Sequence, residues 1–234
     1  MIKAVVFDLD DTLISEKEYI KSGFKEVSMH LSLEIGDEQE LILKKMIQFF
    51  DESPRDVFNR LLRYYGVNYT KEYIMNLVEI YRGHTPNIKF YDDVIPTIKK
   101  LKDRGYKIGI ITDGYKESQV KKIQALKCKK IFDEIIITDE LGREYWKPHD
   151  KAYRLMSEKL KVNLDEMIYV GDNEEKDFIT ANKLGVLTMK IQRVEGVYLN
   201  GLMKKGYKAK YVISNLKEIL IYLEKVNEKS INNI

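Results

Sequence analysis

Carboxylates directly follow two apolar runs of the sequence, at positions where a strand is expected to end. Asp8 and Asp10 come after the run at residues 4–7, and Asp172 comes after the run at residues 167–170. A short, continuous apolar run is typical of a strand buried on both faces of a parallel sheet, and open α/β sheets bind ligands beyond the carboxyl ends of their strands. Asp8 could act there as a nucleophile and Asp10 as an acid or base. The alternative is an acidic turn without chemistry, and these two residues alone do not decide the question.

Two other expected strand ends carry groups that suit a phosphoryl anion. Thr112 supplies a hydroxyl, and Asp113 with Gly114 forms a turn whose backbone N–H groups could face an anion. Lys147 supplies an ammonium directly before Pro148, a residue that fits the first turn of a helix. Each group is common by itself, as an ordinary turn or as a surface lysine. Their significance therefore depends on whether a sheet edge brings them together with the carboxylates.

Asp177 lies in the loop after Asp172 and has two interpretations. It could lie in the first turn of the next helix, because a carboxylate interacts favourably with the positive end of the helix dipole there. It could instead belong to a site to which four strand ends contribute Asp8, Thr112, Lys147 and Asp172. Chance rarely assembles such a set, so the sequence favours a catalytic edge.

Strands and helices alternate along most of the chain, as they do in a parallel, doubly wound sheet. Apolar spacing predicts helices at residues 92–103, 117–126, 148–160, 175–184 and 216–226, and strands at residues 4–7, 106–111, 134–138, 167–170, 186–191 and 210–213. We therefore expect an α/β fold, with a Rossmann-like core in which the carboxyl ends of the strands share one edge.

The interval between Asp8 and Thr112 is much longer than the roughly 30 residues of a βαβ unit. Residues 15–88 fill this interval with apolar positions at helical spacing, interrupted by Gly and Pro. We therefore expect a core domain formed by residues 1–14 and 89–234, and an inserted, all-helical domain formed by residues 15–88.

Composition narrows the class of protein. The 44% hydrophobic and 33% charged residues describe an ordinary globular chain. No segment approaches the roughly 18 apolar residues of a membrane helix, and the first residues lead into a strand without a signal peptide. These features predict a cytoplasmic protein with no membrane partner.

Charge and cysteine content suggest no further partner. The 40 basic and 37 acidic residues nearly balance, which argues against a nucleic-acid partner. The basic cluster at Lys121, Lys122 and residues 127–130 is expected to be a solvated helix end. Cys128 is the single cysteine and is expected to be structural. The oligomeric state is not readable from the sequence.

In their order along the chain, the four strand ends resemble the four motifs of the haloacid dehalogenase superfamily of phosphotransfer hydrolases. The motifs are Asp8-Leu9-Asp10-Asp11-Thr12, the strand that ends in Thr112, Lys147 with Pro148, and Gly171-Asp172 with Asp177. The resemblance extends from residue 1 to about residue 192. In having an acid at Asp10 the chain resembles the phosphatases and phosphomutases of the superfamily, since its dehalogenases lack an acid there. The helical insertion resembles the C1 cap of that superfamily.

The resemblance implies a Mg²⁺-dependent phosphomonoesterase that works through an aspartyl-phosphate. It implies that Asp8 is the nucleophile, that Asp10 is the acid and base, and that Mg²⁺ binds the carboxylates of Asp8 and Asp172 and the backbone carbonyl of Asp10. The remaining roles that it implies are phosphate binding by Thr112, Asp113, Gly114 and Lys147, and orientation of Lys147 or a metal-bound water by Asp177. The expected substrate is a small phosphorylated metabolite, such as a nucleotide or a sugar phosphate. A phosphomutase of the same superfamily and a non-catalytic interaction module are the alternatives.

Overall fold

The computed structural model of this chain describes residues 1–194, 196 and 206–231. The chain forms two compact units, Met1–Glu16 together with Lys89–Ile234, and Lys17–Ile88. We call the first the core unit and the second the helical unit. Among the described residues, no helix is both long enough and apolar enough to cross a membrane.

A six-stranded parallel sheet forms the centre of the core unit, with the strand order β3-β2-β1-β4-β5-β6. The strands are β1 (Ala4–Phe7), β2 (Lys107–Thr112), β3 (Glu134–Ile137), β4 (Met167–Gly171), β5 (Leu187–Ile191) and β6 (Tyr211–Ile213). Phe7 pairs with Ile110 on one side and with Val170 on the other. The residues that follow β1, β2 and β4 therefore lie at one edge of the sheet, and the expected doubly wound α/β class is confirmed.

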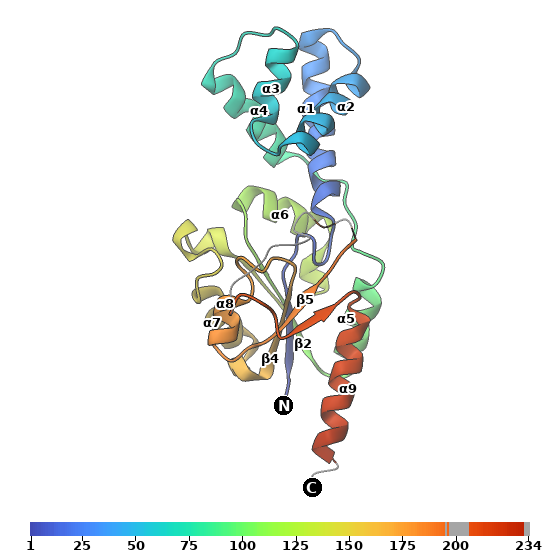
Figure 1. The fold of residues 1–234 in the computed structure, drawn as a ribbon, viewed down its shortest axis with the longest axis vertical. Helices are drawn as coiled ribbons and strands as arrows, with labels where there is room; N and C mark the ends of the chain where they lie inside the picture. Colours follow the sequence, from blue (N-terminus) through green and yellow to red (C-terminus); the bar gives the residue numbers. More distant parts are fainter. Residues whose placement is uncertain (195, 197–205, 232–234) are drawn as a thin grey trace. The chain divides into compact units, whose positions relative to one another are not determined.

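Helices cover both faces of this sheet, with α7 and α8 on one side and α5 and α9 on the other (Figure 1). The helices of the core unit are α5 (Val94–Asp103), α6 (Lys116–Ala125), α7 (Lys151–Leu160), α8 (Ile179–Lys183) and α9 (Lys217–Ile231). All residues of β1 and β4 are buried. Burial on both faces explains why these two strands are continuous apolar runs in the sequence.

The turn before α8 differs from the sequence-based prediction, which began this helix at residue 175. The N–H of Asp177 donates to the carbonyl of Asn173 at 2.9 Å, and the N–H of Glu175 donates to Oδ1 of Asn173 at 2.9 Å. These bonds close a turn over residues 173–177, so α8 begins only at Ile179. Asp177 is therefore fully buried rather than exposed in the first turn of a helix.

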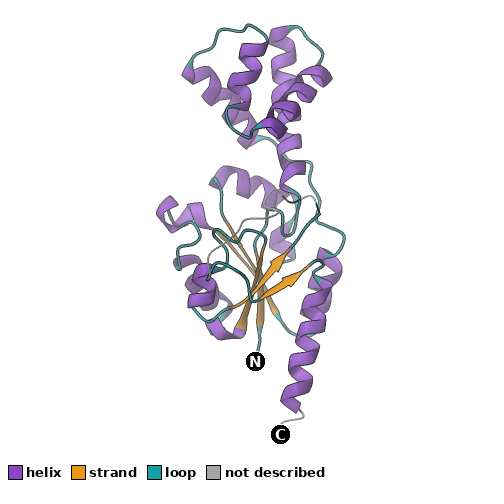
Figure 2. Ribbon diagram, in the orientation of Figure 1, coloured by secondary structure: helices purple, strands orange, loops and turns teal. Residues whose placement is uncertain are grey.

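The helical unit consists of helices and loops only (Figure 2). Its helices are α1 (Glu16–Ile35), whose first residue belongs to the core unit, α2 (Gln39–Glu52), α3 (Val57–Tyr64) and α4 (Lys71–Gly83). Apolar side chains from all four helices form a hydrophobic core of their own, which includes Phe24, Val27, Leu31, Ile42, Met46, Leu61, Leu62 and Leu77. A separate core of this kind is what allows an inserted segment to be a unit by itself.

Candidate active site

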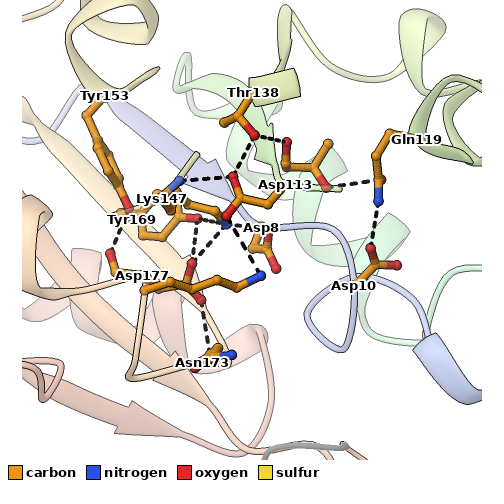
Figure 3. A network of polar contacts seen from close by, with 12 residues as sticks. Asp8, Asp10, Asp113, Gln119, Thr138, Lys147, Tyr153, Tyr169, Asn173 and Asp177 are labelled. Atoms are coloured by element: carbon orange, nitrogen blue, oxygen red, sulfur yellow. Dashed lines mark hydrogen bonds and ion pairs between the residues drawn. The ribbon is translucent and has the colours of Figure 1, made fainter. Parts of the chain in front are cut away.

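Lys147 lies at the centre of a buried polar network at the carboxyl edge of the sheet (Figure 3). Its Nζ donates to Oδ1 of Asp8 at 2.7 Å, to Oδ1 of Asp177 at 2.9 Å and to the hydroxyl oxygen of Tyr169 at 2.9 Å. The side chains of Lys147 and Asp177 have no exposed surface, and that of Asp8 is 2% exposed. The structure thus brings together three residues from three separate motifs. Sequence reasoning missed Tyr169, because a tyrosine inside the apolar run of β4 looks like a core residue.

The carboxylates around Lys147 keep this lysine charged. Burial by itself would lower the pKa of Lys147, but Asp177 and Asp8 raise that pKa well above its usual value. For Asp8, burial outweighs the attraction of Lys147 and raises the pKa to about 6. Asp8 is therefore mainly a carboxylate at neutral pH, which is the form that a nucleophile requires.

Asp8, Asp172 and Asp177 form a cluster of buried carboxylates that could hold a metal ion. One oxygen of each lies within 4.8 Å of the others. Burial, followed by repulsion from Asp177 and Asp8, raises the pKa of Asp172 to about 9. A divalent cation would cancel that repulsion, and carboxylate oxygens are the ligands that hard cations such as Mg²⁺ prefer. The donor set at this edge therefore fits a divalent metal.

The protein already engages both carboxylate oxygens of Asp177. Oδ1 accepts bonds from Lys147 and from the Tyr169 hydroxyl, which lies at 3.2 Å, and Oδ2 accepts the N–H of Asn173 at 3.0 Å. The carboxylate also packs so closely against Gly171 that a Cβ at that position would overlap it. Burial would raise the pKa of Asp177, but Lys147, Lys176 and the hydrogen bonds to the carboxylate together outweigh burial and lower the pKa. This geometry suits the orientation of Lys147 by Asp177.

Thr112 at the end of β2 lies at the same edge, together with Asp113 and Gly114 in the loop that follows. Oδ1 of Asp113 accepts the Thr138 hydroxyl at 2.6 Å and the backbone N–H of Lys147 at 3.2 Å. The side chain of Asp113 therefore ties this loop to the loops that follow β3. The buried hydroxyl of Thr112 donates to Oε1 of Gln119 at 3.1 Å.

Asp10 forms a salt bridge with a second buried lysine, Lys122. Nζ of Lys122, on α6, lies 2.7 Å from Oδ1 and 2.8 Å from Oδ2 of Asp10, and Nε2 of Gln119 donates to Oδ2 at 3.0 Å. Burial by itself would raise the pKa of Asp10, but Lys122 and Gln119 outweigh it and lower the pKa below its usual value.

The prediction of a solvated helix end is therefore wrong for Lys122, which is 3% exposed. Lys122 lies on the same side of α6 as Gln119 and Ile123, both of which are buried. A signal for this was present in the sequence. Gln119 and Lys122 are separated by the helical spacing that places two residues on one face, and that face also carries an apolar residue.

Known proteins are similar to this chain over most of its length. A model of the family described as haloacid dehalogenase-like hydrolase matches residues 5–191. Glyceraldehyde 3-phosphate phosphatase from Methanopyrus kandleri is 31% identical over 201 residues, which cover 82% of this chain and 85% of the relative. Pyrophosphatase PpaX from Bacillus mycoides is 26% identical over 97% of this chain and 99% of its own length. The crystal structure of a HAD phosphatase from Thermococcus onnurineus superposes with a TM-score of 0.61 at 28% identity, covering 95% of this chain and 98% of that one.

Proposed function

Because this chain belongs to the haloacid dehalogenase-like hydrolases and is a phosphatase for small phosphorylated compounds, we propose that it hydrolyses phosphomonoesters through a covalent phosphate on Asp8. The observation that carries this proposal is the buried bond between Lys147 and Oδ1 of Asp8. That bond holds the carboxylate in a fixed orientation at the end of β1, with its other oxygen as the attacking atom. A carboxylate fixed in this way divides one difficult displacement into two easier ones.

Asp10 moves the protons in both half-reactions of the proposed mechanism. Asp10 is ionised in the free protein because Lys122 and Gln119 lower its pKa, so it acts as an acid after it takes up a proton from water when the substrate binds. Oδ2 of Asp8 attacks phosphorus, the bond between phosphorus and the leaving oxygen breaks, and Asp10 gives this proton to that oxygen. A water molecule then attacks the phosphorus of the aspartyl-phosphate while Asp10 takes its proton, which releases phosphate and restores Asp8. One carboxyl group can serve both steps because each step returns it to the state that the other requires.

The proposed metal is Mg²⁺, held by the carboxylates of Asp8 and Asp172 and by the backbone carbonyl of Asp10. When bound, it neutralises charge on the phosphoryl oxygens and aligns them with the nucleophile. Asp177 keeps its place beside Lys147 and orients that ammonium. The backbone N–H groups of Asp113 and Gly114 are the proposed fixed donors for the phosphoryl oxygens. Thr112 and Lys147 would also donate to these oxygens, each by exchanging one bond that it makes here, the hydroxyl its bond to Gln119 and the ammonium one of its three bonds.

We propose glyceraldehyde 3-phosphate as the first substrate to examine, because two relatives named glyceraldehyde 3-phosphate phosphatase align with most of this chain. Inorganic pyrophosphate is the second, on the strength of the likeness to PpaX. We further propose that residues 15–88 act as a cap that selects the substrate and excludes water from the site.

Phosphate release tests the proposed chemistry. We expect turnover of p-nitrophenyl phosphate and glyceraldehyde 3-phosphate with Mg²⁺ and none with EDTA. Asp8→Asn preserves the volume of the side chain but removes its charge, so activity should fall by about 10⁴-fold or more. Asp165→Asn, at an exposed position, is the matched control and should be fully active.

Other outcomes would support the alternatives. Full activity in Asp8→Asn would eliminate the proposed nucleophile. Isomerisation of the substrate without release of phosphate would indicate a phosphomutase, and complete inactivity of a folded protein would indicate an interaction module. Calorimetric titration with Mg²⁺ tests the metal separately, because Asp172→Asn should weaken binding.

A further inference from the structure

Two side chains of α6 contact the acid and base of the proposed mechanism. Lys122 reaches both carboxylate oxygens of Asp10, and Gln119 reaches one of them. Lys122 and Gln119 are each 3% exposed. A buried ammonium bound to both oxygens leaves a carboxylate few alternative rotamers, because any rotation breaks a charge-assisted bond.

The orientation of the Gln119 amide is set by a second contact. Its Oε1 accepts the hydroxyl of Thr112 at 3.1 Å, which directs the NH₂ group towards Oδ2 of Asp10. One amide therefore links the hydroxyl proposed to bind phosphate with the carboxylate proposed to move protons. The two groups cannot shift independently while this amide stays in place.

Gly114 leaves the space that this amide occupies. A Cβ at Gly114 would lie 2.7 Å from Nε2 of Gln119, closer than ordinary packing allows, and the backbone φ of +127° at this residue also favours glycine. The arrangement thus requires particular residue types at three positions, namely Gly114, Gln119 and Lys122. A single surface ion pair would restrict the residue type at its own two positions only.

We propose that Lys122 and Gln119 are positioning residues that aim the carboxylate of Asp10 at the leaving oxygen of the substrate. This inference rests on the proposed function, since it assumes that Asp10 is the acid. The expected loss of activity on removing Lys122 or Gln119 depends on the leaving group of the substrate. A misaimed acid slows the departure of a poor leaving group, which needs a proton, much more than that of nitrophenolate, which leaves without one.

The test compares kcat/KM for glycerol phosphate, a poor leaving group, with kcat/KM for p-nitrophenyl phosphate. For Lys122→Met, we expect a fall of about 10²-fold with glycerol phosphate and of less than about fivefold with p-nitrophenyl phosphate. Gln119→Leu should shift the ratio in the same direction. Lys122→Arg keeps the charge and should restore part of the loss with glycerol phosphate.

Matched controls come from the same helix. Lys121→Met changes a partly exposed residue and Gln124→Leu an exposed one. Both should leave the ratio of the two kcat/KM values at the wild-type level. If Lys122→Met does not fold, as judged by thermal unfolding, Lys122→Arg and Gln119→Leu provide the same comparison.

Asp10→Asn separates this inference from the proposed function. If Asp10→Asn loses activity with glycerol phosphate selectively and Lys122→Met behaves like Lys121→Met, the positioning role is overturned and the mechanism stands. If Asp10→Asn is as active as the wild type, the acid itself is misassigned and both fail. If Lys122 acts through Asp10, adding Lys122→Met to Asp10→Asn should cause no further loss, and a full additional loss would overturn the proposal.

Discussion

Replacement of Lys147 by methionine would remove the positive charge of a side chain that is fully buried between the carboxylates of Asp8 and Asp177. Methionine fills a similar volume, so the main effect is electrostatic. Breaking a buried ion pair by removing one partner costs about 3–5 kcal/mol. Since a native chain is stable by only about 5–15 kcal/mol, Lys147→Met should lower the urea midpoint of the core unit by about 1–2 M.

Trp146 makes the measurement specific to the core unit. It is the single tryptophan of the chain, it precedes Lys147, and its Nε1 donates to Oδ1 of Asp139 at 3.1 Å. Its fluorescence should therefore report unfolding of the core unit separately from the helical unit. The matched control is Lys159→Met, which breaks an exposed ion pair with Glu134 and should cost less than about 1 kcal/mol.

The stability loss in Lys147→Met should depend on pH when measured in EDTA. Burial raises the pKa of Asp8 to about 6 although Lys147 opposes this. The pKa of Asp177 is lowered because Lys147, Lys176 and the hydrogen bonds to the carboxylate together outweigh burial. Removal of Lys147 raises both values, so the carboxyls become protonated more readily as the pH falls. The stabilisation that Lys147 provides through Asp8 is present at pH 8 and is lost as the pH falls through about 6, whereas the part provided through Asp177 persists until the pH falls through the lowered pKa of that group. The loss should therefore be larger at pH 8. Equal midpoints for Lys147→Met and Lys159→Met at pH 8 would show that Lys147 stabilises the core unit no more than an exposed ion pair does.

Two further predictions concern residues outside this network. Arg193 donates from Nε and Nη2 to the carbonyl of Thr12 and pairs with Asp93 at 2.9 Å. Arg193→Met should therefore destabilise the core unit by about 3 kcal/mol. The control is Arg154→Met, at an exposed position, and equal urea midpoints for the two variants would contradict this prediction. Burial raises the pKa of the Cys128 thiol to about 12, which lowers its thiolate fraction at pH 8 by about 10³-fold relative to an ordinary thiol. Ellman's reagent should therefore label Cys128 slowly in the native protein and rapidly in urea, and equal rates would show that the thiol is accessible.

The strands and the residues at their ends are predictable from the sequence because burial on both faces leaves a local pattern. Residues 4–7 and 167–170 are continuous apolar runs, and the structure places them side by side as β1 and β4. Parallel pairing then brings Asp8 and Asp172 to one edge without any long-range information beyond the type of sheet.

The partner of Asp10 was not predictable in the same way. Lys122 has the local appearance of a solvated helix end, since Lys121 and several nearby lysines are on the surface or partly so. Whether a helix turns one lysine inward depends on how α6 packs against the loop after β1. The helical spacing of Gln119, Lys122 and Ile123 indicates that they share one face of α6. It does not identify Asp10 as the partner of Lys122, because that contact joins residues far apart in the chain.

The reaction class follows from the sequence, because the four strand ends and their order along the chain carry the residue types that phosphoryl transfer requires. The pairing of the buried charges follows from the packing of the folded chain. This packing pairs Lys147 with Asp8 and Asp177, and it pairs Lys122 with Asp10. The physical reason is that charge pairing in a protein interior depends on distances of a few ångströms and on burial. Both are set by the packing of helices against the sheet.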